Sequence, residues 1–182
     1  YVSGEVGVGG GVLVDGRPLA GADGYGGEIG HMPVNPTGAA CRCGSTGCWE
    51  TEVGEDALLR LAGRPAGSGR AGVDAVLAAA EAGEPAATAA LGHVGHWLGV
   101  GLAGLVNIFN PRLIVLGGRF ARLAPNVTAT IELELDRRAL GASRGLVRVL
   151  PAELGEDAPL LGAAESAFEP LVEDPAAWLS IR

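Results

Sequence analysis

Residues 27–50 read GEIGHMPVNPTGAACRCGSTGCWE and contain all three cysteines of the 182-residue chain and one of its three histidines. The potential metal ligands in this stretch are His31, Cys41, Cys43 and Cys48. Thiolate sulfur and imidazole nitrogen are the donors that a tetrahedral zinc site prefers. Because four such side chains fill a tetrahedral coordination sphere, the spacing predicts a structural zinc ion rather than one that activates water.

Two other interpretations of the cysteines are open. Three thiols cannot all pair, and one residue separates Cys41 from Cys43, so a disulfide framework is the weaker explanation. The cysteines could also lie in a loop that holds no metal. Gly44 and Gly47 favour the zinc interpretation, since glycine lets a short loop turn sharply enough for three sulfur atoms to converge.

Two glutamates bracket these ligands. Glu28 precedes His31 by three residues, and Glu50 follows Cys48 by two. Metal binding would bring both acids to one place, where each carboxylate could accept hydrogen bonds from the hydroxyls of a sugar. A metal-bound His31 could present its other ring nitrogen to the same ligand. Without a metal between them, both glutamates would be ordinary solvated surface acids.

The pattern Glu-x-Gly-His, followed by Cys-x-Cys-Gly-x-x-Gly-Cys-x-Glu, resembles the signature of the ROK family, which contains bacterial sugar kinases and sugar-responsive repressors. The resemblance extends from residue 7 to about residue 168. It implies that the His and the three Cys bind structural zinc, and that Glu28, His31 and Glu50 contact a sugar. It also implies an α/β fold, the second lobe of the actin-like, ribonuclease H-like fold of sugar kinases, with a zinc-binding loop.

The same resemblance raises the question of nucleotide binding. In kinases of this family a Gly-Thr-Gly-x-Gly-Gly-Gly segment helps to hold the phosphates, but here Glu5 and Val6 stand where its first Gly-Thr is expected. The change removes a hydroxyl donor and places a carboxylate near phosphate oxygens, where like charges repel. Gly117 and Gly118 correspond to a turn that borders the adenine pocket in the family, and a tight turn without a ligand is an equal alternative.

Composition excludes some other functions. The net charge is -8 and the chain contains no lysine, which argues against nucleic-acid binding by this part of the protein itself. No apolar run approaches the length of a membrane span, so we expect no membrane contact. Cysteines kept reduced for a metal indicate the cytoplasm.

Hydrophobic periodicity and turn residues indicate three successive segments, which by the resemblance together form one C-terminal lobe. Residues 1–54 form a Gly-rich β-hairpin and the sugar- and zinc-binding segment, residues 55–112 are helical, and residues 113–182 have the order βαβα. His93 and His96 are predicted to be packing histidines, because no carboxylate or cysteine lies at a matching spacing. The expected elements are a strand over 2–14 ending in a turn at 15–16, helices over 55–61, 73–82, 85–109, about 121–140 and about 157–168, a loop over 62–72, and strands over 113–116 and 147–150.

The missing parts of the family fold limit what these residues can do. The family's first lobe carries an Asp-x-Gly phosphate motif and the aspartate that deprotonates the sugar hydroxyl, and neither is in this sequence. A zinc ion closed by four ligands cannot replace that general base, so we expect the chain to be catalytically inert on its own and to lack the N-terminal lobe.

Two functions of the parent protein follow from the resemblance. In the first, the protein is a dimeric transcriptional regulator whose absent N-terminal domain binds DNA and whose present lobe senses a sugar. In the second, it is a glucokinase or related hexokinase that uses ATP and magnesium. The departure at Glu5 and Val6 favours the regulator. A zinc-stabilised fragment without affinity for any ligand is a third possibility.

Overall fold

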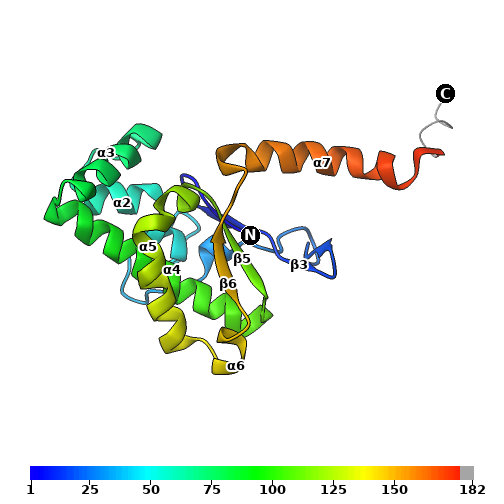
Figure 1. Ribbon diagram of the computed structural model, residues 1–182, viewed down its shortest axis with the longest axis horizontal. Coiled ribbons are helices and arrows are strands. Elements are labelled where there is room, and N and C mark those ends of the chain that lie inside the picture. Colours follow the sequence, from blue (N-terminus) through cyan, green and yellow to red (C-terminus); the bar gives the residue numbers. More distant parts are fainter. Residues whose placement is uncertain (177–182) are drawn as a thin grey trace.

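The computed structural model describes residues 1–176, so the last six residues of the predicted 113–182 segment lie outside the described part (Figure 1). The strands are β1 Val2–Gly4, β2 Val8–Gly10, β3 Leu13–Val14, β4 Arg17–Pro18, β5 Leu113–Gly118 and β6 Arg148–Pro151. The helices are α1 Trp49–Val53, α2 Glu55–Leu61, α3 Gly69–Glu81, α4 Pro85–Phe109, α5 Arg119–Arg138, α6 Gly141–Arg144 and α7 Ala158–Glu173, with 3-10 turns η1 Ile29–His31 and η2 Gly155–Asp157.

A four-stranded mixed sheet in the order β2-β1-β5-β6 forms the centre of the fold. β1 pairs antiparallel with β2 and parallel with β5, and β5 pairs parallel with β6 across the helical connection α5. The register places Gly4 opposite Gly118, so the ends of β1 and β5 lie side by side. Parallel strands joined through helices confirm the predicted α/β class.

The glycine-rich N-terminus differs from the single strand predicted for residues 2–14. It folds back on itself at the hairpin turn Glu5–Gly7, where the Glu5 N–H donates to the Gly7 carbonyl at 3.0 Å, and so forms both β1 and β2. The predicted second turn is confirmed: Asp15 and Gly16 have φ values of 51° and 77° and join β3 to β4. The second turn depends on Asp15 and Gly16 because both tolerate a positive φ.

The core lies between the sheet and the long helices. α5 packs on β1, β5 and β6, α4 packs along α5, and α1, α2 and α3 contact α4. Three glycines of α4 allow close helix packing: a methyl group on Gly95 or Gly99 would press against α5, and one on Gly101 would collide with Trp49. Gly92 and Gly104 have no such neighbour within 4 Å.

α4 has the predicted bounds, but it is more apolar than the sequence analysis allowed for. Its 25 residues include an 18-residue window of mean hydropathy 1.3, so by length and composition alone it could cross a membrane. In this fold 61% of that window is buried inside the chain, as in the core helix of a globular protein. The helix ends as predicted at Asn110, which adopts the left-handed conformation (φ 46°) before Pro111.

Other boundaries differ from the prediction by a turn or more. α1 was not predicted, and α3 begins at Gly69, inside the segment expected to be a loop. α7 extends to Glu173, beyond the predicted end near residue 168. Figure 1 shows α7 projecting away from the rest of the fold, and none of its described side chains is buried.

Candidate metal and sugar site

Residues 33–48, which we call the knot loop, are held in shape by hydrogen bonds within their own backbone. The Cys41 N–H donates to the Ser45 carbonyl and the Gly47 N–H to the Ala39 carbonyl, both at 2.8 Å. Gly44 and Gly47 have φ values of 92° and 69°, which confirms that both glycines are needed for the turn. Cys41 and Cys43 are thereby turned towards Cys48, which lies at the N-terminal end of α1.

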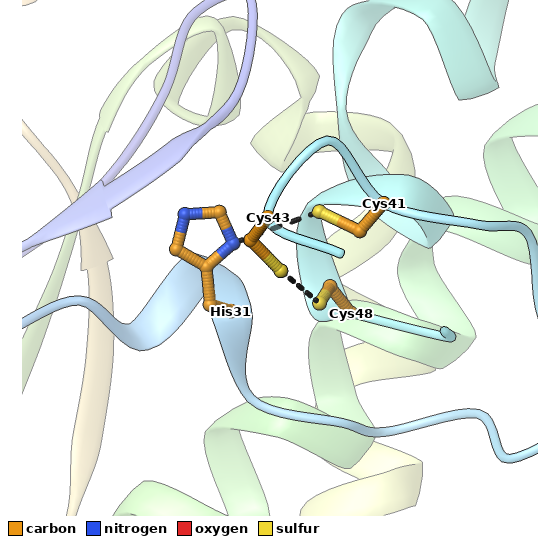
Figure 2. A group of neighbouring side chains, drawn as sticks. All are labelled: His31, Cys41, Cys43 and Cys48. Atoms are coloured by element: carbon orange, nitrogen blue, oxygen red, sulfur yellow. Dashed lines mark hydrogen bonds between the residues drawn. The ribbon is translucent and has the colours of Figure 1, made fainter. Parts of the chain in front are cut away.

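The four predicted ligands converge. Figure 2 shows His31 and the three cysteines grouped together, and their ligand atoms lie within 4.8 Å of one another. Cys43 Sγ is 3.6 Å from Cys48 Sγ, and His31 Nδ1 is 3.7 Å from Cys41 Sγ. A tetrahedron with ordinary zinc bond lengths has edges of about 3.8 Å between sulfurs and about 3.6 Å between sulfur and nitrogen. The cluster therefore fits a metal ion, and all three cysteines are free thiols in this structure.

The thiols differ in how firmly they hold their protons. The backbone N–H of Cys43 lowers the pKa of Cys41, but burial and the Glu50 carboxylate outweigh it and raise this pKa to about 12. Burial also raises the pKa of Cys48, whereas the backbone N–H of Ser45 lowers the pKa of Cys43. A metal ion that binds here must displace thiol protons, so its affinity depends on pH.

Both bracketing glutamates reach this cluster. Glu28 Oε2 lies 3.9 Å from His31 Nε2, on the side of the ring that faces away from the sulfurs. Glu50 Oε1 lies 3.2 Å from Cys41 Sγ and 3.8 Å from His31 Nδ1. The Glu50 side chain is 13% exposed and that of Glu28 66% exposed. The fold thus places Glu28, His31 and Glu50, three side chains that can form hydrogen bonds with hydroxyl groups, at the metal cluster.

A pocket of about 270 Å³ adjoins Glu50. Cys41 and Thr51 line it together with Val6 of the hairpin turn, whereas Glu28 and His31 do not. A methyl group on Gly7 would come within 2.5 Å of Glu50 Oε2, so the hairpin turn also closes against this carboxylate. Glu50 consequently lies between the metal cluster and the hairpin turn.

The other predicted ligand site, the glycine turn Gly117–Gly118, is packed against the chain itself. A methyl group on Gly117 would collide with the Tyr1 ring, and one on Gly118 would collide with the Glu5 carboxylate. The next residue, Arg119, is 5% exposed and donates to the backbone carbonyls of Glu5 and Val53. Its burial lowers its pKa to about 10.

Sequence reasoning missed the partners of two histidines. His93 Nε2 lies 3.1 Å from Glu52 Oε2, and His96 Nδ1 lies 3.2 Å from Glu134 Oε1. The carboxylates come from α1 and α5, so no spacing within α4 could have revealed them. The packing role predicted for these histidines must therefore include two ion pairs or hydrogen bonds to buried acids.

The comparisons with known proteins agree with this geometry. The model of the ROK family matches residues 1–169. The chain is 31% identical over 169 residues to a xylose repressor of Bacillus spizizenii (93% of this chain, 44% of the relative), and 32% identical over 181 residues to a glucokinase of Streptomyces coelicolor (90% and 57%). Its fold matches the crystal structure of a ROK family glucokinase from Streptomyces griseus in complex with glucose and AMPPNP, with a TM-score of 0.76, 32% identity and coverage of 90% and 58%.

The chain therefore belongs to the ROK family. It spans about half the length of the curated relatives that it matches, and these relatives include both repressors and kinases.

Proposed function

We propose that this member of the ROK family is the sugar-sensing effector lobe of a transcriptional regulator, with a structural zinc ion and half of a sugar-binding cleft. Glu28, His31 and Glu50 supply the sugar contacts, and His31, Cys41, Cys43 and Cys48 supply the zinc ligands. The tetrahedral spacing of the ligand atoms and the two glutamates beside them support this assignment.

Zinc orients the sugar site without taking part in chemistry. If Nδ1 of His31 binds the metal, Nε2 carries the proton and points towards Glu28. The three cysteines are free thiols, which is the form that zinc requires and that the cytoplasm maintains. We therefore place the protein in the cytoplasm.

The observation that carries the choice of regulator over kinase is the position of Glu5. Its carboxylate lies against Gly118, on the turn that borders the nucleotide in kinases of the family. Arg119 binds the Glu5 backbone and fills the space between the hairpin turn and α1. A carboxylate at this position would repel nucleotide phosphates, and the turn has lost the threonine that would bind them.

The rest of the regulator lies outside these residues. We assign DNA binding to another domain of the parent protein, because the chain has a net charge of -8 and no lysine. The xylose repressor and the glucose complex among its relatives support a monosaccharide as the ligand. A homodimer is a further proposal. The long apolar helix α4 could contribute to its interface only in part, because 61% of its apolar window is buried within the chain.

The similarity to the Streptomyces griseus glucokinase favours the second candidate, the lobe of an ATP- and magnesium-dependent sugar kinase. In that case Gly117 and Gly118 would contact the nucleotide. The zinc and sugar sites would be the same in a regulator and in a kinase. Only the segment expected to bind phosphate, which contains Glu5 and Val6, separates the two functions.

The test uses the full-length parent protein with D-glucose, D-xylose and N-acetylated hexosamines. A coupled assay with ATP and magnesium measures phosphorylation, and thermal melting measures sugar binding. We expect no turnover and a rise in Tm with one sugar class. Turnover on any of the sugars would refute the regulator and establish the kinase, whereas neither turnover nor a melting shift would refute the sugar site.

A further inference from the structure

Glu52 is a buried carboxylate that the proposed site does not use. Its side chain is 6% exposed, and its two oxygens contact different parts of the fold. Oε1 accepts a hydrogen bond from Asn35 Nδ2 at 2.9 Å, and Oε2 lies 3.1 Å from His93 Nε2. A carboxylate is seldom buried unless its oxygens are paired, and here both oxygens have a partner.

Glu52 shares the short helix α1 with Glu50. Residues two apart on a helix are rotated by about 200°, so the two side chains leave opposite sides of α1. Glu50 faces the metal cluster and Glu52 faces α4. A helix of five residues has little stability of its own, so tertiary contacts must determine its orientation.

Asn35 connects Glu52 to the knot loop. Its backbone N–H donates to the Gly47 carbonyl at 3.1 Å, and its carbonyl accepts a hydrogen bond from the Gly38 N–H at 2.9 Å. A methyl group on Gly47 would collide with the Asn35 carbonyl, and Gly47 directly precedes the metal ligand Cys48. A displacement of Asn35 would therefore move the backbone next to that ligand.

α4 is the fixed side of this connection. His93 lies within this 25-residue helix, whose apolar residues form much of the core. The fully buried Trp49 also attaches α1 to α4, because its Nε1 donates to the Trp97 carbonyl at 2.7 Å. Trp49 and Glu52 together hold α1 on α4, and Glu52 additionally reaches the knot loop.

We propose that Glu52 is a positioning residue for the metal and sugar site. Through Asn35 it holds the knot loop, and through His93 it holds α1, so that Cys48 and Glu50 keep the geometry in which they bind. The inference rests on the proposed function, since it concerns the same site. Glu52 itself touches neither the metal ligands nor the pocket beside Glu50.

The experiment uses cobalt(II) as the probe, because its visible spectrum reports the geometry and the thiolate ligands of the site. Glu52→Ala and Asn35→Ala are expected to weaken cobalt binding roughly 10- to 100-fold and to alter the spectrum. Glu52→Gln, which keeps an acceptor for Asn35, should restore part of the affinity. Glu52→Ala should also reduce the sugar-dependent rise in Tm.

Glu134→Ala is the matched control. Glu134 of α5 is 4% exposed and lies 3.2 Å from His96 of α4. Its ion-pair partners among the described residues are His96, Arg137 and Arg138, and none of them belongs to the knot loop. A purely structural role of buried acids predicts that both alanine variants lower Tm and that neither changes the cobalt spectrum. The proposed positioning role predicts that only the Glu52 variant changes it.

The outcomes separate this inference from the proposed function. Wild-type cobalt affinity and spectrum in both Glu52→Ala and Asn35→Ala would overturn the positioning role alone. Asn35 is only half-buried, so Asn35→Ala provides the test if Glu52→Ala does not fold. Failure of the wild-type protein to bind cobalt would overturn the metal site and this inference with it. If no sugar changes the Tm, the sugar site is refuted, and the cobalt affinities of the variants still test the positioning role of Glu52.

Discussion

The two sides of the hairpin turn Glu5–Gly7 differ in what they offer a ligand. On one side, Glu28, His31 and Glu50 gather around a cluster that fits a metal ion. On the other, the glycine turn Gly117–Gly118 is packed against Glu5 and Tyr1. The proposed sugar contacts thus lie on the first side, while the chain's own side chains fill the second. The metal motif alone does not distinguish a regulator from a kinase, and the proposed choice between them rests on the residues of the hairpin turn.

Of all the changes predicted here, removal of a metal ligand from the first side should have the largest effect on stability. Cys43 is exposed, so Cys43→Ser removes a ligand without opening a cavity in the core. Loss of the metal should lower the free energy of unfolding by on the order of 5 kcal/mol, which corresponds to a fall in Tm of about 10–20 °C. Calorimetry and elemental analysis measure both effects, and the variant should melt like the wild type when both are in excess chelator. Unchanged melting with full zinc content would refute the structural metal.

Metal affinity should decrease steeply as the pH falls. The pKa values of Cys41 and Cys48 are raised, so a metal ion displaces a proton from each of them near neutral pH. Displacement of two protons changes the apparent affinity by about a hundredfold for each pH unit between pH 6 and 8, with the weaker binding at the lower pH. Competition with a chromophoric chelator measures the slope. An affinity independent of pH would mean that these thiols are not the ligands.

Neutralising Glu50 should weaken sugar binding with little effect on folding. A hydrogen bond to a charged group contributes about 1.5–3 kcal/mol, so Glu50→Gln should lower sugar affinity by roughly 10- to 150-fold. Glu28→Gln should have a smaller effect, because Glu28 is 66% exposed. Glu5→Gln, on the other side of the turn, is the control and should bind sugar like the wild type. If the sugar-dependent melting shift is the same in all three variants, the glutamates of the first side do not bind the sugar.

The smallest effect is expected from restoring the phosphate motif. The double change Glu5→Gly and Val6→Thr removes the carboxylate from Gly118 and supplies a hydroxyl donor. Millimolar AMPPNP should then stabilise the protein by about 1 kcal/mol, or about 3 °C in Tm, while the wild type shows no shift. If AMPPNP stabilises the wild type equally, Glu5 and Val6 do not prevent nucleotide binding, and the proposed contrast between the two sides is wrong.

Local sequence patterns were sufficient for the parts of the molecule that are built from nearby residues. The metal ligands lie within eighteen positions of one another, and glycines at 44 and 47 made their convergence predictable. The periodicity of α4 and the stop at Asn110 were predictable for the same reason. The hairpin turn at Glu5–Gly7 was missed because alternating glycine and valine fit one strand as well as two.

The sequence by itself determined the α/β class, the family and the four side chains that could bind a metal, since each of these depends on spacing along the chain. The tertiary structure alone decided which groups Arg119 and Glu52 contact. Glu5 meets Arg119 across 114 positions and Glu52 meets His93 across 41. A buried charge requires partners, and the fold supplies those partners from distant segments when the core closes, so no local pattern can identify them.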